Sequence, residues 1–236
     1  GCHMKLDEIK KQVYDANLEL VRRNLVIYTW GNVSVIDRER NLVIIKPRGI
    51  EYAKLEPEDM SVVDMDGKTV DGKLLPSVDL DIHLAMYRRF PKIGAIAHTH
   101  STFATAWAQA RRDIPVYGTT HGDHFYGCIP CTRGMIPEDV KGNYEANIGN
   151  VIVDTFESRG IDPMQVFGVL AAGHGPFTWG ANAAAAVENS VILEELSKMA
   201  FLTELLTSHP TQLEPFALDK HFLRKHGAEA YFYQTK

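Results

Sequence analysis

The chain has 236 residues, of which 45% are hydrophobic and 23% charged, and its formal net charge is −5. This composition is typical of a globular protein with a full hydrophobic core, and the acidic balance argues against a general nucleic-acid-binding protein. No apolar run approaches the roughly 18 residues of a membrane span, and no signal peptide is visible. We therefore expect a cytoplasmic protein without nucleic-acid or membrane partners. Residues 1–3, before Met4, are interpreted as a cloning scar, and residues 4–236 as a single domain.

The predicted elements alternate between helices and strands along the chain. Apolar residues three and four apart, or runs rich in Ala, Leu and Glu, predict helices over 5–23, 79–90, 102–111, 147–158 and 182–206. Short β-branched or apolar runs predict strands over 32–36, 41–47, 93–99 and 166–175, and alternation around Asp66-Gly67 predicts a hairpin over 61–73. This succession favours a three-layer α/β/α sandwich around a mixed sheet, with Trp30 and Trp179 in its core.

Two of the predicted buried strands end in histidine. His98 and His100 project from the same side of the strand at 93–99, because residues i and i+2 share a face. His174 ends another strand between glycines, which permit a sharp turn. Such residues could also make separate hydrogen bonds, but three imidazoles together suit a divalent ion such as Zn²⁺.

A carboxylate could complete this set of ligands. Asp79 follows a Pro-Ser turn at the start of a predicted helix, where its alternative role is that of the helix N-cap. Asp81 and His83 are rival ligands, but on a helix we expect them to point away from Asp79. A site of three neutral imidazoles and one carboxylate keeps a net positive charge, so its ion could polarise a carbonyl group and stabilise an enolate.

The two cysteines after residue 3 form a C-x-x-C pair, Cys128 and Cys131. Such a pair could be a redox centre or half of a zinc site. A cysteine zinc site would need a second pair, and a redox pair usually begins a helix, whereas this segment is rich in Pro and Gly. A structural role is therefore favoured.

Segments spread over essentially the whole chain carry a resemblance to a known family. These segments are "TWGNVS", "IKPRG", "AHTHS", "GTTHGDHFYGCIPCTR", "GNVIVDTFE" and "HGPFTWG". On them the chain resembles the class II aldolase/epimerase family, and within it the L-ribulose-5-phosphate 4-epimerases. The resemblance implies a largely antiparallel central sheet, one divalent ion per subunit (Zn²⁺ in the first place), a sugar phosphate substrate, and a homotetramer with active sites at subunit interfaces.

The same resemblance assigns the metal ligands to Asp79, His98, His100 and His174. In the related aldolases the first of these positions is a Glu that acts as a base, so an Asp favours the epimerase branch. The implied reaction inverts C4 of L-ribulose 5-phosphate to give D-xylulose 5-phosphate. It does so by retro-aldol cleavage of the C3–C4 bond, rotation of the aldehyde, and re-addition.

The resemblance also implies two proton-transfer groups. Asp123 matches one acid/base, and His221 matches a residue that completes the site from a neighbouring subunit. The other acid/base of the family is the second Tyr of an Ala-Tyr-Tyr pattern, but ungapped alignment places Phe232 there. Tyr233 is the preferred substitute and Tyr231 the alternative.

The substrate-binding residues implied by the resemblance are Gly31, Asn32, Lys46, Arg48, Gly49, Ser77, Val78, Thr119 and Glu145. Arg48 and Val78 stand where the family has hydroxyl side chains. Because a guanidinium binds phosphate or carboxylate, a non-phosphorylated or carboxylated sugar stays open as the substrate. Two other classes also stay open: an aldolase that releases its products, and a non-catalytic interaction module such as adducin, which the four retained ligands disfavour.

Overall fold

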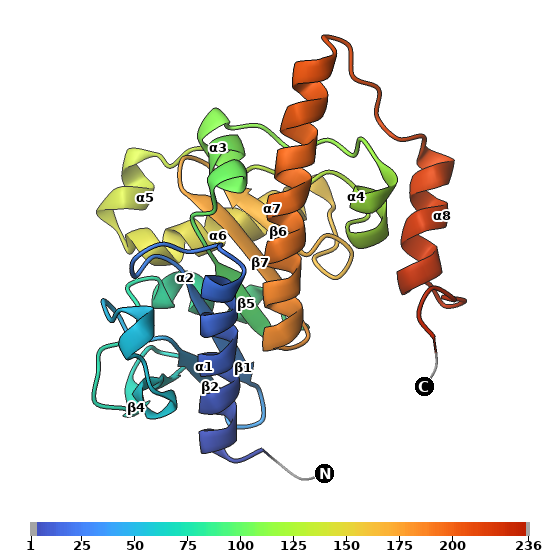
Figure 1. Cartoon of the computed structure of the whole chain (residues 1–236). Coiled ribbons are helices and arrows are strands. Elements are labelled where there is room, and N and C mark those ends of the chain that lie inside the picture. The colour runs from blue at the N-terminus through green and yellow to red at the C-terminus, as the bar shows by residue number, and fades with distance from the viewer. Residues whose placement is uncertain (1–3, 235–236) are drawn as a thin grey trace.

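The computed structural model describes residues 4–234, so the predicted cloning scar at 1–3 lies outside the described residues. A single seven-stranded sheet runs through them, with helices on both of its faces (Figure 1). The helices are α1 (Leu6–Arg22), α2 (Leu80–Arg89), α3 (Thr102–Ala110), α4 (Thr119–His124), α5 (Pro137–Lys141), α6 (Tyr144–Arg159), α7 (Ala183–Leu206) and α8 (Pro215–His226), and two short 3₁₀ turns lie at Tyr52–Lys54 and Pro57–Asp59. None of the helices within residues 4–234 combines the length and the apolar character that crossing a bilayer requires.

The sheet has the strand order β4-β3-β2-β1-β5-β7-β6. Its strands are β1 (Asn32–Asp37), β2 (Leu42–Ile45), β3 (Ser61–Asp64), β4 (Thr69–Asp71), β5 (Ala95–His98), β6 (Gly168–Ala171) and β7 (Gly175–Gly180). Every neighbouring pair of strands is antiparallel. The predicted α/β sandwich is thus confirmed, whereas the mixed sheet is not: among the described residues the one parallel pairing is an isolated bridge between Cys131 and Leu170.

The alternation of β5 divides the core between the two faces of the sheet. Ala95 and Ala97 belong to the cluster formed with α1 and α7, and Ile96 belongs to the cluster formed with α2 and α6. Because alternate residues of a strand share a face, His98 lies on the same side of β5 as Ile96. The last residue of a central strand is thereby directed toward the start of α2.

Elements that the sequence did not predict lie mainly in the second half of the chain. The helix expected from residue 147 begins at Tyr144, because the Asn143 side chain caps it by accepting a hydrogen bond from the Ala146 N–H at 3.2 Å. Only the first half of the strand predicted over 166–175 forms a strand, β6, because the chain turns back at 172–174 and continues as β7. Helices α4 and α5 are too short for a hydrophobic period to be visible, and α8 begins at a proline.

Candidate metal centre

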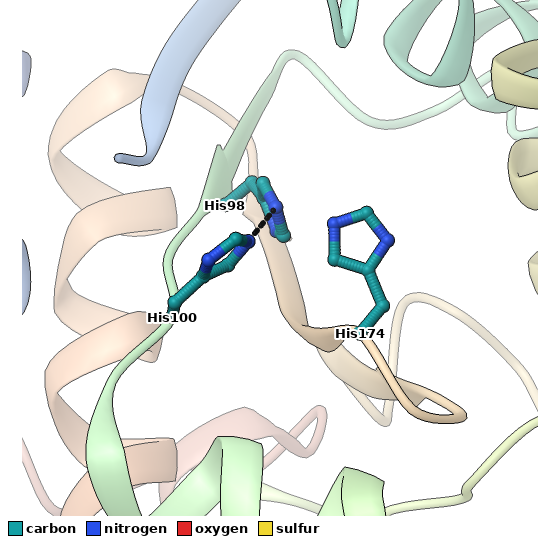
Figure 2. Close-up of side chains that lie close together, drawn as sticks. All are labelled: His98, His100 and His174. Atoms are coloured by element: carbon teal, nitrogen blue, oxygen red, sulfur yellow. Dashed lines mark hydrogen bonds between the residues drawn. The ribbon is translucent and has the colours of Figure 1, made fainter. Parts of the chain in front are cut away.

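Three histidine side chains converge where β5 ends and where β6 turns into β7 (Figure 2). His98 is the last residue of β5, His100 follows it in the loop before α3, and His174 lies in the β6–β7 turn. One ring nitrogen from each residue lies within 4.8 Å of the others. The Nε2 atoms of His98 and His100 are 3.2 Å apart, so the structure brings the three predicted imidazoles together.

The ring of His98 is held in one orientation. Its Nδ1–H donates to the carbonyl oxygen of Pro176 at 2.8 Å, and its face stacks on Phe177 with ring centroids 3.9 Å apart. The side chain is fully buried. A proton on Nδ1 leaves the Nε2 lone pair directed at the other two imidazoles, which is the arrangement usual for a metal-ligating histidine.

Asp79 lies beside these histidines and does not cap its helix. It occupies the N-cap position of α2, but its side chain makes no capping hydrogen bond. Its Oδ2 instead accepts from the Asn32 Nδ2–H at 2.8 Å and lies 3.9 Å from His98 Nε2. The alternative role of Asp79 as the helix cap is therefore wrong.

The prediction that His83 points away from Asp79 is wrong as well. Residues four apart on a helix share a face, and His83 reaches the same amide, Asn32, whose Oδ1 lies 2.7 Å from His83 Nε2. Asp81 does diverge, since its carboxylate accepts from Asn143 Nδ2 at 3.1 Å. Sequence reasoning missed His83, although its spacing from Asp79 was visible.

Burial keeps the imidazoles neutral. It lowers the pKa of the fully buried His98 to about 3, and partial loss of water around the exposed His100 and the half-buried His174 lowers the pKa of both from the usual value, although the nearby Asp79 acts in the opposite direction. For Asp79 itself burial acts to raise the pKa, but His98 and the Asn32 hydrogen bond outweigh burial and hold it below the ordinary value. Neutral imidazoles beside a carboxylate form a donor set that fits Zn²⁺ or a similar divalent ion.

The β6–β7 turn approaches the other ligands because Gly175 has no side chain. A Cβ atom there would lie 2.9 Å from the Thr99 carbonyl oxygen and 3.4 Å from Cδ2 of His100. Real Cβ atoms do not approach a backbone oxygen so closely, so a larger residue would displace the turn that carries His174. The glycines around His174 thus allow the β6–β7 turn to lie close to the Thr99–His100 loop, and they also allow the chain to turn.

A cavity of about 660 Å³ opens beside His100 and His174. Trp30 lines it and is 46% exposed, with its ring centroid 5.9 Å from that of His100. The prediction that Trp30 lies in the core is therefore wrong, whereas Trp179 is fully buried as predicted. The wall of the cavity also includes Thr105, whose Oγ1 is the one buried side-chain polar atom without a hydrogen-bond partner among the described residues.

Several predicted substrate-binding residues lie around Asp79. Asn32 donates to Ser77 Oγ at 3.2 Å as well as to Asp79, and Lys46 is only 3% exposed, with its Nζ donating to the Thr29 carbonyl at 3.2 Å. Burial lowers the pKa of Lys46 to about 8, although Asp79 acts to raise it. Lys46 therefore gives up its proton at a lower pH than an exposed lysine does.

The loops that carry Arg48 and Val78 lie side by side. A bridge pairs Pro47 with Pro76, and Arg48 Nε donates to the Pro76 carbonyl at 3.0 Å. Val78 is 57% exposed, and no other atom lies within 4 Å of a Cβ placed on Gly49. These residues border open space, as an anion-binding position requires. Two further predicted positions differ in their surroundings: Gly31 leaves no room for a Cβ, which would be 2.8 Å from the His98 carbonyl oxygen, and Glu145 is half-buried in the first turn of α6.

The predicted residues Asp123 and His221 lie on α4 and α8 and form a second group with Arg224, which the sequence did not indicate; we call these three residues the Asp123 cluster. Asp123 Oδ1 lies 3.0 Å from His221 Nδ1 and accepts from Arg224 Nη2 at 3.1 Å. Thr119 is exposed in the first turn of α4, and α8 forms an edge of the molecule in Figure 1. Within residues 4–234, no hydrogen bond or ion pair of Asp123 joins it to the three histidines.

The C-terminal aromatic residues lie over the same helix. Tyr233 is 65% exposed with Lys225 Nζ 5.6 Å from its ring centroid, whereas Phe232 stands 5.1 Å from the guanidinium carbon of Arg224. Lys220 Nζ lies over the ring of Tyr231, 5.0 Å from its centroid. All three rings therefore belong to the surroundings of the Asp123 cluster and not to those of the histidines.

The cysteines are half-buried and reduced. Burial and the nearby Asp113 raise the pKa of Cys128, and raise that of Cys131 to about 11. Thiols that stay protonated are poor nucleophiles and poor metal ligands. This environment is consistent with the structural role that we predict.

An antiparallel sheet between helix layers, with a histidine cluster at the ends of its strands, defines an α/β protein of the aldolase type. Residues 11–201 match the model of the class II aldolase and adducin N-terminal domain family, and the chain belongs to that family. The family-level resemblance is therefore confirmed. Membership supports metal-dependent chemistry of the aldolase or epimerase type.

Solved structures of similar proteins agree with this assignment. An L-fuculose 1-phosphate aldolase is 25% identical with a TM-score of 0.78, over 94% of this chain and 97% of that one. YgbL of Klebsiella pneumoniae, described as a putative aldolase/epimerase/decarboxylase, is 21% identical with a TM-score of 0.72, over 92% and 99% of the two chains. An L-fuculose 1-phosphate aldolase from Glaciozyma antarctica PI12 is 17% identical with a TM-score of 0.73, over 94% and 85%. The last two show the fold alone.

Proposed function

We propose that this protein is a metal-dependent epimerase that inverts C4 of a ketopentose phosphate, L-ribulose 5-phosphate to D-xylulose 5-phosphate, by retro-aldol and aldol steps. The observation that carries the proposal is the carboxylate beside the three imidazoles. It is an Asp whose Oδ2 is already engaged by Asn32. A carboxylate held in this way serves as a metal ligand and not as a mobile base, so proton transfer needs another group.

In this proposal Asp79, His98, His100 and His174 hold one divalent ion, Zn²⁺ in the first place. When bound, the ion polarises the ketose carbonyl and stabilises the negative charge that develops as the C3–C4 bond breaks. Trp30 covers one side of the cavity beside His100 and limits the access of water to the cleaved aldehyde. An aldehyde retained there can rotate and add back.

Proton transfer is assigned to Asp123 on one side of the substrate, with His221 completing the site. Arg224 and His221 both contact the Asp123 carboxylate, so its oxygen atoms are fixed in position. Tyr233 is the proposed partner on the other side, and Tyr231 is the alternative. Phe232 cannot transfer a proton.

The Asp123 cluster acts, in this proposal, on the metal site of a neighbouring subunit in a homotetramer. Support comes from the lack, within residues 4–234, of any hydrogen bond or ion pair between Asp123 and the three histidines, and from large apolar side chains exposed at the end of α7 and the start of α8: Leu205 at 68%, Leu206 at 87% and Phe216 at 76%. Such apolar patches mark association surfaces. The oligomer would then complete the site.

The phosphate end of the substrate is assigned to Arg48, Gly49 and Ser77, with Lys46, Thr119 and Glu145 nearby in the assembled site. The terminal nitrogens of Arg48 remain available after Nε has bonded to Pro76. A planar guanidinium binds phosphate through two parallel hydrogen bonds. Val78 provides only an apolar wall.

A second candidate is a class II aldolase that releases its products. The likeness to the L-fuculose 1-phosphate aldolase favours it, as does the presence of Phe232 at the position of the family tyrosine. In that case the substrate is a different sugar, non-phosphorylated or carboxylated.

One incubation separates these possibilities. The Zn²⁺-loaded protein is mixed with L-ribulose 5-phosphate, and the products are followed by NMR. D-xylulose 5-phosphate supports the epimerase, whereas free glycolaldehyde phosphate shows an aldolase. An Arg48→Ala variant should raise KM and leave kcat largely unchanged, because in this proposal Arg48 contacts only the anion. Turnover of unphosphorylated ketoses alone would overturn the phosphate assignment, and no turnover of any ketose would overturn the function.

A further inference from the structure

Behind the Asp79 carboxylate lies a row of buried polar side chains that the proposed reaction does not use. Tyr87 Oη lies 2.7 Å from Ser34 Oγ, and Ser34 Oγ lies 2.6 Å from His83 Nδ1. His83 Nε2 lies 2.7 Å from Asn32 Oδ1, and Asn32 Nδ2 donates to Asp79 Oδ2 at 2.8 Å. The first three side chains are fully buried and Asn32 is 2% exposed. Buried polar groups are normally hydrogen-bonded, and a fully satisfied network in a core fixes its side chains in one arrangement.

The row arises from the packing of α2 on β1. Asp79, His83 and Tyr87 are four residues apart, so they form one stripe along the helix. Asn32 and Ser34 are two residues apart, so they face the same side of the strand. The helix stripe and the strand residues alternate along the row. Its order is therefore fixed by secondary structure.

With a neutral His83 ring, only one arrangement of protons satisfies all of these groups. The Asn32 N–H faces the carboxylate, so its Oδ1 has to accept a hydrogen bond from His83 Nε2–H. A neutral imidazole then accepts at Nδ1 from the Ser34 hydroxyl, and Ser34 accepts in turn from Tyr87. Burial lowers the pKa of His83 to about 4 and raises the pKa of Tyr87. At neutral pH both groups therefore remain in the protonation states that the row requires.

We propose that His83 is a positioning residue of the metal site, which holds the Asn32 amide with its N–H toward Asp79 and so fixes that carboxylate as a ligand. Without a donor at His83, the buried Asn32 oxygen loses its partner, and the amide is held toward the carboxylate only by its own bonds to Ser77 and Asp79. The inference deepens the proposed function, because it rests on the metal site assigned there. It does not depend on the substrate.

Three variants test the role of His83 through Zn²⁺ binding to the metal-stripped full chain, measured by competition with a chromophoric chelator. His83→Leu removes the donor and should raise the Kd for Zn²⁺ about 10- to 100-fold, as the loss of a group that orients a ligand usually does. His83→Gln keeps a side-chain N–H for Asn32 and should recover most of that affinity.

Ser197→Ala is the matched control, since Ser197 is also a fully buried polar residue but donates to the Leu193 carbonyl on α7. It should leave the Kd unchanged within about threefold. A His83→Leu protein with wild-type affinity for Zn²⁺, or a Ser197→Ala protein that loses as much, would overturn the proposal.

The tautomer of His83 gives a readout that needs no variant. In the ¹⁵N-labelled wild-type protein at pH 7, long-range ¹H–¹⁵N correlations should show a neutral ring protonated at Nε2. A ring protonated at Nδ1, or an imidazolium, would overturn the proposed row. If the wild type binds no Zn²⁺, the proposed metal function fails, whereas the tautomer still decides whether the row exists.

Discussion

The three-histidine cluster and the Asp123 cluster are held in place by different interactions. The histidines stand at the ends of central strands, and His98 is fully buried, hydrogen-bonded at Nδ1 and stacked on Phe177. The Asp123 cluster joins the six-residue helix α4 to α8 through ion pairs between half-buried side chains. The first cluster is held by the core of the sheet, whereas the second depends on how α8 docks.

This difference indicates that the histidine cluster can be complete within one chain, whereas the Asp123 cluster can act on another subunit. A metal centre needs ligands fixed to within a few tenths of an ångström, and strand ends provide that. A proton-transfer group can be brought by a helix at an edge of the molecule, where a second subunit can meet it. Variants of the two clusters should therefore differ in their effects on Zn²⁺ binding and on kcat.

The largest expected effect is the loss of one metal ligand. His100→Ala should abolish stoichiometric Zn²⁺ binding and lower kcat by about 10⁴-fold, since the ion contributes several kcal/mol of transition-state stabilisation. The free energy of unfolding of the metal-free protein should change by less than about 1 kcal/mol, because His100 is exposed. His209→Ala, at another exposed histidine, is the control and should keep both metal and activity. A His100→Ala protein within tenfold of the wild-type kcat would contradict the metal assignment.

The next effect separates proton transfer from metal binding. Asp123→Asn should lower kcat by about 10²- to 10³-fold, as expected for the loss of an acid/base, and should leave the Zn²⁺ content unchanged. The control is Asp219→Asn, at an exposed carboxylate of α8 that pairs with Tyr126.

Mixing two inactive variants tests whether the clusters meet across subunits. Refolded mixtures of His100→Ala and Asp123→Asn chains should regain part of the wild-type activity, because some interfaces then combine an intact metal centre with an intact Asp123. If the mixture stays as inactive as its components, both clusters act within one chain.

The three-histidine cluster could be predicted because its signals are local. Alternation in a strand places His98 and His100 on one side, and the glycines beside His174 mark a turn, without any knowledge of the packing. The layered fold followed from the same periodicities. The resemblance added the family, which the match over 11–201 bears out.

The rest depends on packing that no local pattern contains. The row behind Asp79 exists because one face of α2 lies on β1, so His83 was assigned the wrong direction. Trp30 was expected in the core as a large aromatic residue, but left-handed backbone at Tyr28 and Gly31 (φ of 54° and 85°) turns this segment outward. The position of α8 relative to the sheet is likewise a tertiary property.

Both regions contain buried neutral histidines that should weaken the fold in acid, among them His83 and His121. Burial lowers the pKa of both His83, behind the metal site, and His121, in α4, to about 4. Below about pH 6.5 the unfolded chain binds protons that the folded chain does not, so the free energy of unfolding falls as the pH falls toward 4. The expected loss is about 2 kcal/mol per group by pH 5.

Urea unfolding of the metal-free protein between pH 7 and pH 5 measures this loss. His121→Gln should reduce the slope by the share that belongs to His121, and leave the shares of the other histidines whose pKa burial lowers, such as His83, His98 and His124. A free energy of unfolding that is constant from pH 7 to pH 5 would show that these histidines are not buried in the neutral form.

The smallest effect concerns the cysteines that lie in the chain between α4 and β6. Cys128 contacts Asp113 and Arg159, and its thiol stays protonated because burial raises its pKa. Cys128→Ala should therefore cost less than about 1 kcal/mol in unfolding free energy and leave both Zn²⁺ content and kcat unchanged. Alkylation of the wild type with iodoacetamide at pH 7 should be slow compared with that of a free thiol. Loss of zinc in the Cys128→Ala variant would show that Cys128 is a metal ligand, and rapid alkylation of the wild type would favour a redox role for the cysteine pair. Unchanged zinc content together with slow alkylation would support a metal site formed only by the residues at the strand ends.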